Sequence, residues 1–319
     1  MTQDQRQQDG RTTRPVVCVG EVMVELARGE DGRFGLGYGG DTFNTAVYLA
    51  RAGIPAAYAS VLGDDGFSAA IRAVGAQEGI DMAPVLTAPG QAPGLYLITT
   101  DAAGERSFHY WRETSPARTL FEREGWQEVA ARMVEARAIY FSGITLSLYG
   151  NAGLGRLLAT LEMAAANGVP RIFDGNFRPR GWGGDVARAR TVYAEALKRT
   201  SLALPTFEDE ALLWGDSSPA ATIERITTFG VREVVVKAGA AGCLVHAEGN
   251  TVAIPVEQAL SPVDTTGAGD SFNAAYLAAR LDGAGAPAAA LAGHRLAASV
   301  IMHRAPILPR PAPAGVGRH

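Results

Sequence analysis

Residues 136–176, ARAIYFSGITLSLYGNAGLGRLLATLEMAAANGVPRIFDGN, hold the pattern that decides the fold. The apolar run at 136–143 predicts a buried strand, 154–168 predicts a helix that ends at a glycine, and 171–176 predicts a second buried strand. A strand, a helix and a strand in this order form a unit whose two strands lie parallel. This stretch therefore predicts an α/β fold built on a parallel sheet.

The same alternation continues on both sides of this stretch. Further strands are predicted at 15–20, 56–63 and, as three short strands, 231–255. Further helices are predicted at 44–53, 67–79, 185–199, 269–281 and 286–303. Repeated units of this kind predict a mainly parallel, doubly wound sheet, with ligands bound beyond the carboxyl ends of its strands.

One segment breaks the alternation. GLYLITTDAAGERSFHYWRE at 94–113 alternates in side-chain character on both sides of the turn signal DAAGE at 101–105, which predicts a β-hairpin. No crossover helix follows it, so we place the hairpin with residues 33–40 in a small sheet that stands off the main one as a lid. We expect one domain over 15–308, with the lid inserted at about 33–40 and 94–113, and flexible tails at 1–14 and 309–319.

Composition and charge exclude several classes of protein. The 319 residues are 47% apolar and 19% charged, which excludes a disordered or fibrous chain. With 29 Lys and Arg against 33 Asp and Glu, the net charge of −4 argues against a nucleic-acid or anionic-membrane binder. Cys18 and Cys243 have no metal-ligand spacing. No leader or run of about 18 apolar residues occurs, so we expect a soluble cytoplasmic protein.

The segment VDTTGAGDSFNAAYLAARL at 263–281 joins a glycine-rich turn directly to an apolar helix. Its free backbone N–H groups at Gly267, Ala268 and Gly269 are expected to point together at the helix start, an arrangement that binds phosphate. Asp270 then lies in the first helical turn. The motif by itself leaves two interpretations open, a phosphate site with a catalytic carboxylate or a tight turn in which Asp270 only complements the helix dipole.

The segment GYGGDTFNTAVYLARAG at 37–53 places a glycine pair before Asp41 and Asn44 at the start of a helix. Glycine allows a ligand to approach the backbone closely, and an asparagine side chain both donates to and accepts from hydroxyl groups. A polyol could therefore bind here. The alternative is a turn in which Asp41 is the N-cap of the helix.

These two segments resemble the two signature regions of the ribokinase-like (PfkB) carbohydrate kinases, in the expected order, and the resemblance spans about residues 15–308. Within the family the branch that acts on 2-keto-3-deoxygluconate is most similar, and fructokinases share similar stretches. The segments that carry this likeness are GEVMVEL, GYGGDTFNTAVYLARAG, GLYLITTDAAGERSFHYWRE, FDGNFRPRGW and LPTFEDE. The resemblance implies a ribokinase-like three-layer core, a β-sheet lid that often joins subunits into a homo-oligomer, and phosphorylation of a sugar hydroxyl by ATP and Mg²⁺.

The resemblance also assigns catalytic roles. Asp270 matches the catalytic base, and an anion hole is formed by Gly267, Ala268 and Gly269. The residues suit this chemistry, because a carboxylate can accept the proton of an attacking alcohol while amides and Mg²⁺ stabilise charge on the phosphoryl oxygens.

Arg112 and Arg178 are expected to recognise an acidic sugar, since a guanidinium fork suits a carboxylate. The resemblance places both near the substrate, within a set that comprises Gly39, Gly40, Asp41, Asn44, Tyr96, Tyr110, Arg112, Arg178 and Asp270. Aromatic residues on a strand can instead serve packing or a dimer contact. His109 and Tyr110 compete for one role, because the segment between Arg106 and Arg112 is one residue longer than in some relatives.

The resemblance implies a nucleotide site along KAGAAGCLV at 237–245 and around it. The residues carried over are Asn176, Arg178, Thr206, Lys237, Gly239, Ala240, Gly242, Thr266, Gly267, Gly269 and His294. Lys237 could instead be a surface lysine and His294 a packed histidine. Glu208 matches an acidic residue linked to Mg²⁺, and Asp264 matches a position that helps bind a monovalent cation, K⁺. The segment HRAPI at 303–307 departs from the family pattern around that cation.

We therefore expect an ATP-dependent kinase for 2-keto-3-deoxygluconate. A neutral-sugar kinase, such as a fructokinase, would use the same machinery without the arginine clamp. A non-catalytic sugar-binding protein would have no need for Asp270. A dinucleotide enzyme is disfavoured, because GEVMVEL after the first strand lacks G-x-G-x-x-G.

Overall fold

A computed structural model of the chain describes residues 13–29, 31–100, 106–258 and 260–310. The strands of its main sheet are β1 (Val16–Val19), β4 (Ala56–Leu62), β5 (Ile80–Asp81), β6 (Val85–Thr87), β9 (Ala138–Ser142), β10 (Arg171–Asp174), β11 (Leu202–Ala203), β12 (Glu233–Lys237), β13 (Cys243–Ala247) and β14 (Asn250–Ile254). Their order across the sheet is β14-β13-β12-β11-β10-β9-β1-β4-β5, with β6 paired to β4.

The sheet is parallel except at one edge. β1 lies between β4 and β9 and runs parallel to both, while β13 and β14 are antiparallel to their neighbours. All four residues of β1 are buried, which is why this strand reads as a continuous apolar run. The predicted mainly parallel, doubly wound sheet is confirmed.

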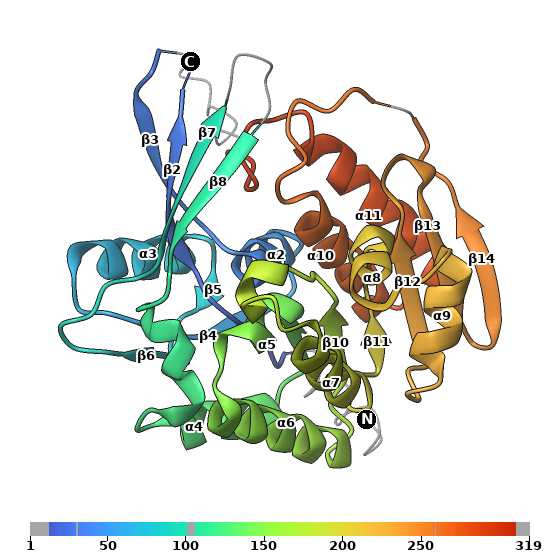
Figure 1. Cartoon of the computed structure of the whole chain (residues 1–319), viewed down its shortest axis with the longest axis horizontal. Coiled ribbons are helices and arrows are strands. Elements are labelled where there is room, and N and C mark those ends of the chain that lie inside the picture. Colours follow the sequence, from blue (N-terminus) through green and yellow to red (C-terminus); the bar gives the residue numbers. More distant parts are fainter. Residues whose placement is uncertain (1–12, 30, 101–105, 259, 311–319) are drawn as a thin grey trace, which may run out of the picture.

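Helices cover both faces of the sheet and produce three layers (Figure 1). One face carries α4 (Trp126–Val134), α5 (Gly143–Leu148), α6 (Asn151–Ala166), α7 (Val186–Leu197), α8 (Phe207–Trp214) and α9 (Pro219–Thr227). The other face carries α2 (Asp41–Arg51), α3 (Gly66–Gln77), α10 (Ala268–Leu281) and α11 (Ala286–Val300). Short 3-10 helices are η1 (Pro116–Glu122), η2 (Pro179–Trp182) and η3 (Gly239–Ala241). Each face has its own buried apolar cluster, so the core is split by the sheet.

A separate sheet of four strands stands above the main sheet at the upper left of Figure 1. Its strands are β2 (Met23–Arg28), β3 (Phe34–Gly39), β7 (Leu95–Thr100) and β8 (Arg106–Trp111), in the order β3-β2-β7-β8. The predicted hairpin is confirmed as the antiparallel pair β7 and β8, and its turn at 101–105 lies outside the described residues. The predicted lid omitted β2, which pairs with β3 on one side and β7 on the other.

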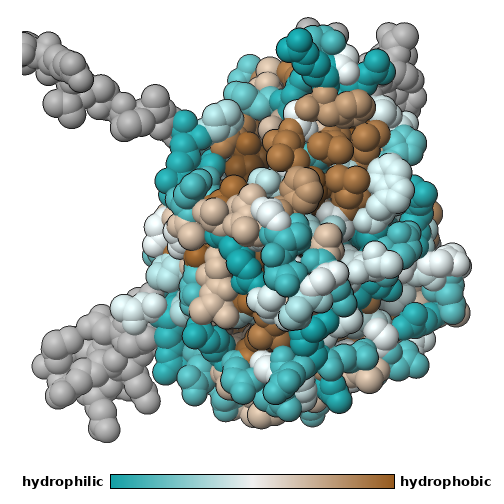
Figure 2. Space-filling model, turned by 90° about the vertical axis from the view of Figure 1, so that its left-hand side faces the viewer, coloured by the Kyte–Doolittle hydropathy of each residue, from teal (hydrophilic) through white to brown (hydrophobic). Residues whose placement is uncertain are grey.

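The two faces of the small sheet differ. Met23, Tyr96 and Ile98 form a small apolar cluster on the face toward the main domain. The opposite face exposes 55% of Leu36 and 56% of Trp111. Figure 2, which views the molecule from the β3 side, shows apolar side chains gathered over the upper part of this face.

Several element boundaries differ from the predicted ones by a few residues. α2 begins at Asp41 and not at residue 44, and α11 ends at Val300 and not at residue 303. The predicted tails lie mostly outside the described residues, which begin at 13 and end at 310. Among the helices that are described, none combines the length and the apolar character needed to cross a membrane.

Candidate active site

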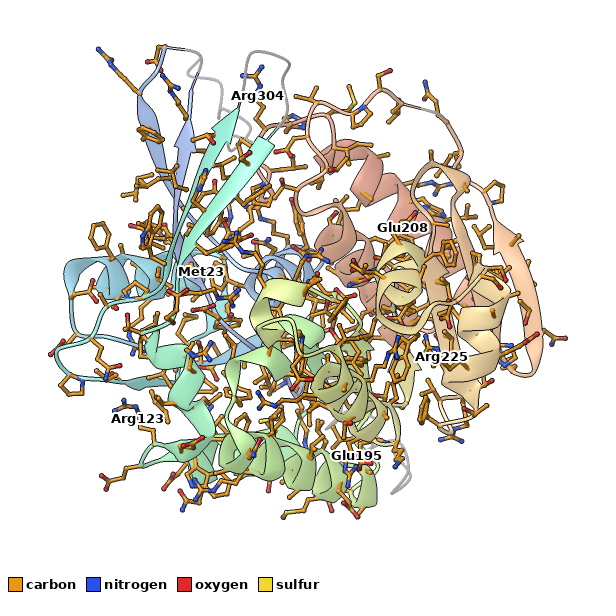
Figure 3. All side chains as sticks on the ribbon, viewed as in Figure 1. Met23, Arg123, Glu195, Glu208, Arg225 and Arg304 are labelled. Atoms are coloured by element: carbon orange, nitrogen blue, oxygen red, sulfur yellow. The ribbon has the colours of Figure 1, made fainter. Side chains whose placement is uncertain are left out.

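The candidate site lies where the carboxyl ends of the parallel strands meet the first turns of α2 and α10. A cavity of about 490 Å³ opens there beneath the small sheet, and we call it the sugar-side cavity after the ligand that the resemblance leads us to expect there. The residues that line it are Glu21, Met23, Gly40, Asp41, Asn44, Tyr96, Phe108, Tyr110, Arg112, Ile144, Asp174, Asn176, Arg178, Thr206, Lys237, Thr265, Thr266, Gly267, Gly269 and Asp270. Figure 3 labels Met23 at the base of the small sheet, beside this region. The cavity is where a doubly wound sheet is expected to bind its ligand.

The glycine-rich turn before α10 has the conformation that its sequence requires. Gly267 is the N-cap, with a φ of +78°, and a Cβ built on it would lie 2.7 Å from Cβ of Pro306. Only glycine suits such a position. The expected set of three free amides is wrong in one detail, because the Ala268 N–H donates to the Thr265 carbonyl at 3.2 Å.

Asp270 lies in the first turn of α10, partly exposed to the sugar-side cavity. Its Oδ2 accepts a hydrogen bond from Nδ2 of Asn44 at 2.8 Å. Loss of hydration on burial, and then the nearby charge of Asp41, raise the pKa of Asp270 well above its usual range. The helix has no side-chain cap, and Asp270 lies in its first turn, where the carboxylate also complements the helix dipole.

The start of α2 faces the same cavity. Its N-cap is Gly40, where a Cβ would lie 2.1 Å from the carbonyl oxygen of Glu21. Asp41 is therefore not the N-cap, and its Oδ2 accepts from Nδ2 of Asn176 at 2.9 Å. Oδ1 of Asn44 is buried with no hydrogen-bond partner among the described residues. An unpartnered buried acceptor in a cavity suits a ligand hydroxyl.

The small sheet contributes aromatic side chains from its inner face. Tyr96 and Tyr110 are cross-strand partners whose ring centroids lie 6.0 Å apart, and both line the cavity. The Tyr96 hydroxyl donates to Glu25 in a short hydrogen bond. His109 pairs with Leu97 on the opposite face. The register thus brings Tyr110, and not His109, to the site.

Both predicted clamp arginines line the cavity, and each is paired with a carboxylate. Arg112 forms an ion pair with Glu21, which is 2% exposed, while Nε of Arg112 has no hydrogen-bond partner among the described residues. Nη1 of Arg178 lies 2.8 Å from Oδ1 of Asp209, and its side chain is 57% exposed. The sequence-based prediction did not include Glu21 or Asp209.

A second cavity, of about 510 Å³, adjoins the first, and we call it the nucleotide-side cavity after the ligand expected there. Of the residues expected to bind the nucleotide, it is lined by Thr206, Lys237, Gly239, Ala240, Gly242, Gly269 and His294. The others line the sugar-side cavity, and their contact with nucleotide phosphates stays a prediction: Asn176, Arg178, Thr266 and Gly267. Four residues line both cavities: Thr206, Lys237, Thr265 and Gly269. The two cavities therefore meet at the start of α10.

Lys237 and His294 have defined surroundings in the nucleotide-side cavity. Lys237 is only 8% exposed, so it is not a surface lysine. The His294 ring packs edge-on against Phe272 at a centroid distance of 5.2 Å, and its Nε2 lies 3.2 Å from the Ile254 carbonyl oxygen. Burial lowers the pKa of His294. This histidine is both packed and part of the cavity wall.

The structure does not bring the two predicted metal residues to either cavity. Glu208 is exposed on α8, where Figure 3 labels it, whereas the next residue, Asp209, turns toward Arg178. Asp264 is 6% exposed, and its Oδ1 accepts from the backbone N–H of Thr266 at 3.0 Å.

Within the described ranges, no three His, Cys, Asp or Glu side chains form a group that could hold a metal ion. Mg²⁺ in phosphoryl-transfer enzymes takes most of its ligands from phosphates and water and needs only one or two carboxylates. Asp174, 3% exposed and lining the sugar-side cavity beside Lys237, fits such a role. The residues are therefore compatible with Mg²⁺ that arrives on a nucleotide.

Sequence and structure comparisons extend over nearly the whole chain. Residues 13–313 match a family model described as pfkB family carbohydrate kinase. The 2-dehydro-3-deoxygluconokinase of Dickeya dadantii (strain 3937) is 40% identical over 309 residues, which cover 93% of this chain and 98% of that protein. The Escherichia coli (strain K12) protein of the same name is 39% identical over 311 residues, 94% of this chain and 99% of that one.

A solved structure agrees with these matches. The PfkB protein from Polaromonas sp. JS666 superposes with a TM-score of 0.81 at 26% identity, covering 91% of this chain and 96% of that one. The family match at 13–313 includes both the main sheet and the small sheet. With its glycine-rich turn, Asp270 and paired cavities in place, this chain belongs to the PfkB family of carbohydrate kinases.

Proposed function

We propose that this chain is a 2-keto-3-deoxygluconate kinase, which transfers the terminal phosphoryl group of ATP to the 6-hydroxyl of 2-keto-3-deoxygluconate, also called 2-dehydro-3-deoxygluconate. The observation that carries the proposal is the meeting of the two cavities at Lys237 and Gly269, with the Asp270 carboxylate on the sugar side. The name of the two similar relatives supports the choice of sugar.

In the proposed reaction Asp270 accepts the proton of the 6-hydroxyl as the oxygen attacks. A bond forms between that oxygen and the terminal phosphorus, and the bond from this phosphorus to the bridging oxygen breaks, which releases ADP. Asn44 holds the Asp270 carboxylate in place through its hydrogen bond of 2.8 Å. An elevated pKa makes Asp270 a stronger base once it is ionised.

The start of α10 would bind the phosphoryl oxygens. Its backbone N–H groups and the positive end of the helix dipole attract negative charge, and the Lys237 ammonium lies beside them. Mg²⁺ would supply charge neutralisation on the phosphates, and Asp174 is the carboxylate placed to hold it. Positioning and electrostatics would thus provide most of the rate enhancement.

The arginines support an acidic substrate over a neutral one. Nε of Arg112 is buried and lacks a hydrogen-bond partner among the described residues, so a ligand carboxylate can satisfy it without displacing Glu21. Arg178 lines the other part of the cavity and is held by Asp209. A fructokinase has no substrate carboxylate to pair with this Nε of Arg112. A non-catalytic binding protein has no need for a carboxylate at Asp270.

The role of Asp264 in K⁺ binding remains a prediction. Its carboxylate already accepts from both the N–H and the hydroxyl of Thr266. We expect K⁺ to alter turnover if the prediction is right, and the same assay can be run with and without it.

The test is release of ADP from Mg-ATP with a panel of acceptors: 2-keto-3-deoxygluconate, its galacto epimer, gluconate, fructose, ribose and adenosine. We expect turnover with the keto-deoxy acids, and a phosphate monoester on C6 in the ³¹P and ¹H spectra of the product. Turnover on fructose or ribose alone would replace the proposed substrate while leaving the kinase machinery. If no acceptor in the panel supported ADP release, the proposal would be contradicted entirely.

A further inference from the structure

Four buried polar side chains behind the meeting point of the cavities form a closed ring of hydrogen bonds. Nζ of Lys237 donates to Oδ1 of Asn273 at 2.9 Å and to Oδ1 of Asp174 at 3.3 Å. Nδ2 of Asn273 donates to the Tyr140 hydroxyl at 2.9 Å, and that hydroxyl lies 3.5 Å from Oδ2 of Asp174. Asn273 and Tyr140 are fully buried.

The chemistry of the ring fixes the direction of its hydrogen bonds. An ammonium can only donate, so the Asn273 amide must present its oxygen to Lys237 and its nitrogen to Tyr140. The tyrosine hydroxyl, which accepts from Asn273, is then left to donate toward Asp174. Asn273 cannot flip without placing its NH₂ group against the ammonium, which makes it a rigid acceptor for Lys237.

The ring brings together segments that are far apart in the sequence. Lys237 ends β12, Asp174 ends β10, Tyr140 lies in β9, and Asn273 belongs to the second turn of α10. The ring therefore ties the strand ends to the same helix whose first turn carries Asp270. The Lys237 ammonium is thereby fixed relative to the helix that carries the proposed base.

The ammonium itself faces the meeting point of the cavities. Nζ of Lys237 lies 3.6 Å from the position that a Cβ on Gly269 would occupy, and both residues line both cavities. An ammonium has three N–H donors, and the described residues accept two of them. The third is available to a group that passes between the cavities.

We propose that Asn273 is a positioning residue for phosphoryl transfer, which holds the Lys237 ammonium against the terminal phosphoryl group of the bound nucleotide. The proposal rests on the proposed function in that it requires a nucleoside triphosphate in the nucleotide-side cavity, but it does not depend on which sugar is bound. Tyr140 acts one step further away, by holding the amide of Asn273.

The ring could instead serve only to satisfy buried polar groups, and stability measurements alone would not separate the two roles. A positioning role makes a specific prediction, because only a triphosphate reaches the ammonium. Loss of Asn273 should weaken binding of a triphosphate and leave binding of a diphosphate nearly unchanged. A purely structural defect should weaken both to a similar extent.

The experiment measures calorimetric affinities of the full chain for the non-hydrolysable β,γ-imido analogue of ATP and for ADP, both with Mg²⁺ and without sugar. We expect Asn273→Ala to lower affinity for the analogue about 10-fold and to change affinity for ADP less than about twofold, in line with loss of one charge-assisted contact.

Lys237→Met provides the coupling test. It should lower kcat about 10² to 10³-fold, as removal of a donor to a developing charge does, and adding Asn273→Ala to it should lower kcat no further. Thr160→Ala is the matched control, because Thr160 is a buried polar residue on α6 whose hydroxyl donates to Arg156 O. It should lower stability and leave the ratio of the two affinities unchanged.

Equal losses for the analogue and ADP in Asn273→Ala, or additive losses of kcat in the double variant, would overturn the proposal. Should Asn273→Ala fail to fold, Tyr140→Phe replaces it. We expect Tyr140→Phe to lower affinity for the analogue by a smaller factor and to leave affinity for ADP unchanged. An equal loss of affinity for both nucleotides would contradict the proposal. The binding measurement needs no sugar. A protein that does not phosphorylate the keto-deoxy acid would therefore refute the proposed function and leave the test of Asn273 valid.

Discussion

Asp270 combines two properties that a general base requires, access to the sugar-side cavity and a raised pKa. Burial and the charge of Asp41 raise that pKa, and the ionised form is the one that accepts a proton. Protonation removes the basic form, so kcat/KM for the sugar should fall as the pH drops through the raised pKa of Asp270. We expect Asp270→Asn to lower kcat about 10² to 10⁴-fold, measured by steady-state ADP release.

The matched readout for Asp270→Asn is nucleotide affinity. Asparagine keeps the size of the side chain, so Mg-ADP should bind as it does to the wild type. Turnover near the wild-type rate would remove Asp270 from the role of base. An unchanged fall of activity at low pH in the variant would assign the titration to another group.

Arg112 and Arg178 differ in exposure, and the expected effects of their loss differ accordingly. Arg112→Gln should weaken binding of the keto-deoxy acid by about 2–5 kcal/mol and raise KM accordingly, because the Arg112 side chain is only 20% exposed and its contact with the substrate carboxylate would be shielded from water. Arg178→Gln should weaken binding of the keto-deoxy acid by only about 1 kcal/mol, since the Arg178 side chain is 57% exposed and its charge is screened by water. Both effects are measured as KM at saturating Mg-ATP.

Arg123→Gln is the control for both arginine variants, because Arg123 lines neither cavity and lies well below Met23, a residue of the sugar-side cavity, in Figure 3. It should leave KM unchanged. A KM for Arg112→Gln within twofold of the wild type would mean that the substrate carboxylate binds elsewhere.

At the scale of single residues, the sequence predicted the side chains that lie in local motifs. Asp270, Asn44 and four residues of the stretch 237–242 reach the cavities because each lies at the end of a strand or at the start of a helix. Partners from distant segments could not be predicted in this way. Nothing near Arg112 in the sequence points to Glu21, and whether Glu208 or Asp209 faces inward depends on where the first turn of α8 begins.

Among the elements, the start of α10 depends most on one backbone conformation. Gly267 has a φ of +78°, and a Cβ there would lie within 2.9 Å of three atoms of Pro306. We expect Gly267→Ala to lower the free energy of unfolding by more than the about 1–2 kcal/mol typical of left-handed backbone. It should also reduce kcat, since the amides at the start of α10 would shift. Denaturant melts and ADP release measure the two effects.

Gly283 supplies the control at the other end of the same helix. Its φ is +91°, and a Cβ there would have no atom within 4 Å. Gly283→Ala should therefore show the conformational cost alone, with normal kcat. Equal loss of activity in both variants would show that the turn before α10 has no special role.

The small sheet shows where prediction from sequence reaches its limit at the scale of elements. The hairpin of β7 and β8 could be predicted, because both strands and their turn lie within twenty residues. β2 could not be assigned to this sheet, because it follows β1 of the main sheet after a few residues and pairs with β7 about seventy residues away. Such a choice depends on tertiary contacts and not on local pattern.

For the whole molecule, the alternation of strands and helices was sufficient to predict a mainly parallel, doubly wound sheet with the candidate site beyond the carboxyl ends of its strands, whereas the three-layer core was implied by the family resemblance. That pattern does not encode whether copies of the chain associate. The outer face of the small sheet nevertheless exposes Phe34, Leu36 and Trp111 by 48%, 55% and 56%, which is unusual for a monomer surface. We propose that this face joins two copies of the chain.

Leu36→Glu tests that proposal. A charge at the centre of an apolar interface should shift the protein from dimer to monomer in sedimentation velocity, because the carboxylate would lose its hydration. Leu212→Glu is the control, since Leu212 is 61% exposed on α8, away from the small sheet. A wild type that sediments as a monomer, or a Leu36→Glu variant that remains dimeric, would contradict the proposal.

The central claim is that this kinase acts on an acidic sugar, and the most direct measurement compares kcat/KM for 2-keto-3-deoxygluconate and for fructose in one buffer with saturating Mg-ATP. A neutral sugar would leave the buried Nε of Arg112 without a partner, so the site should discriminate strongly against it. We predict a ratio of kcat/KM values of about 10³ or more in favour of the acid. A ratio near one, or a preference for fructose, would contradict the account.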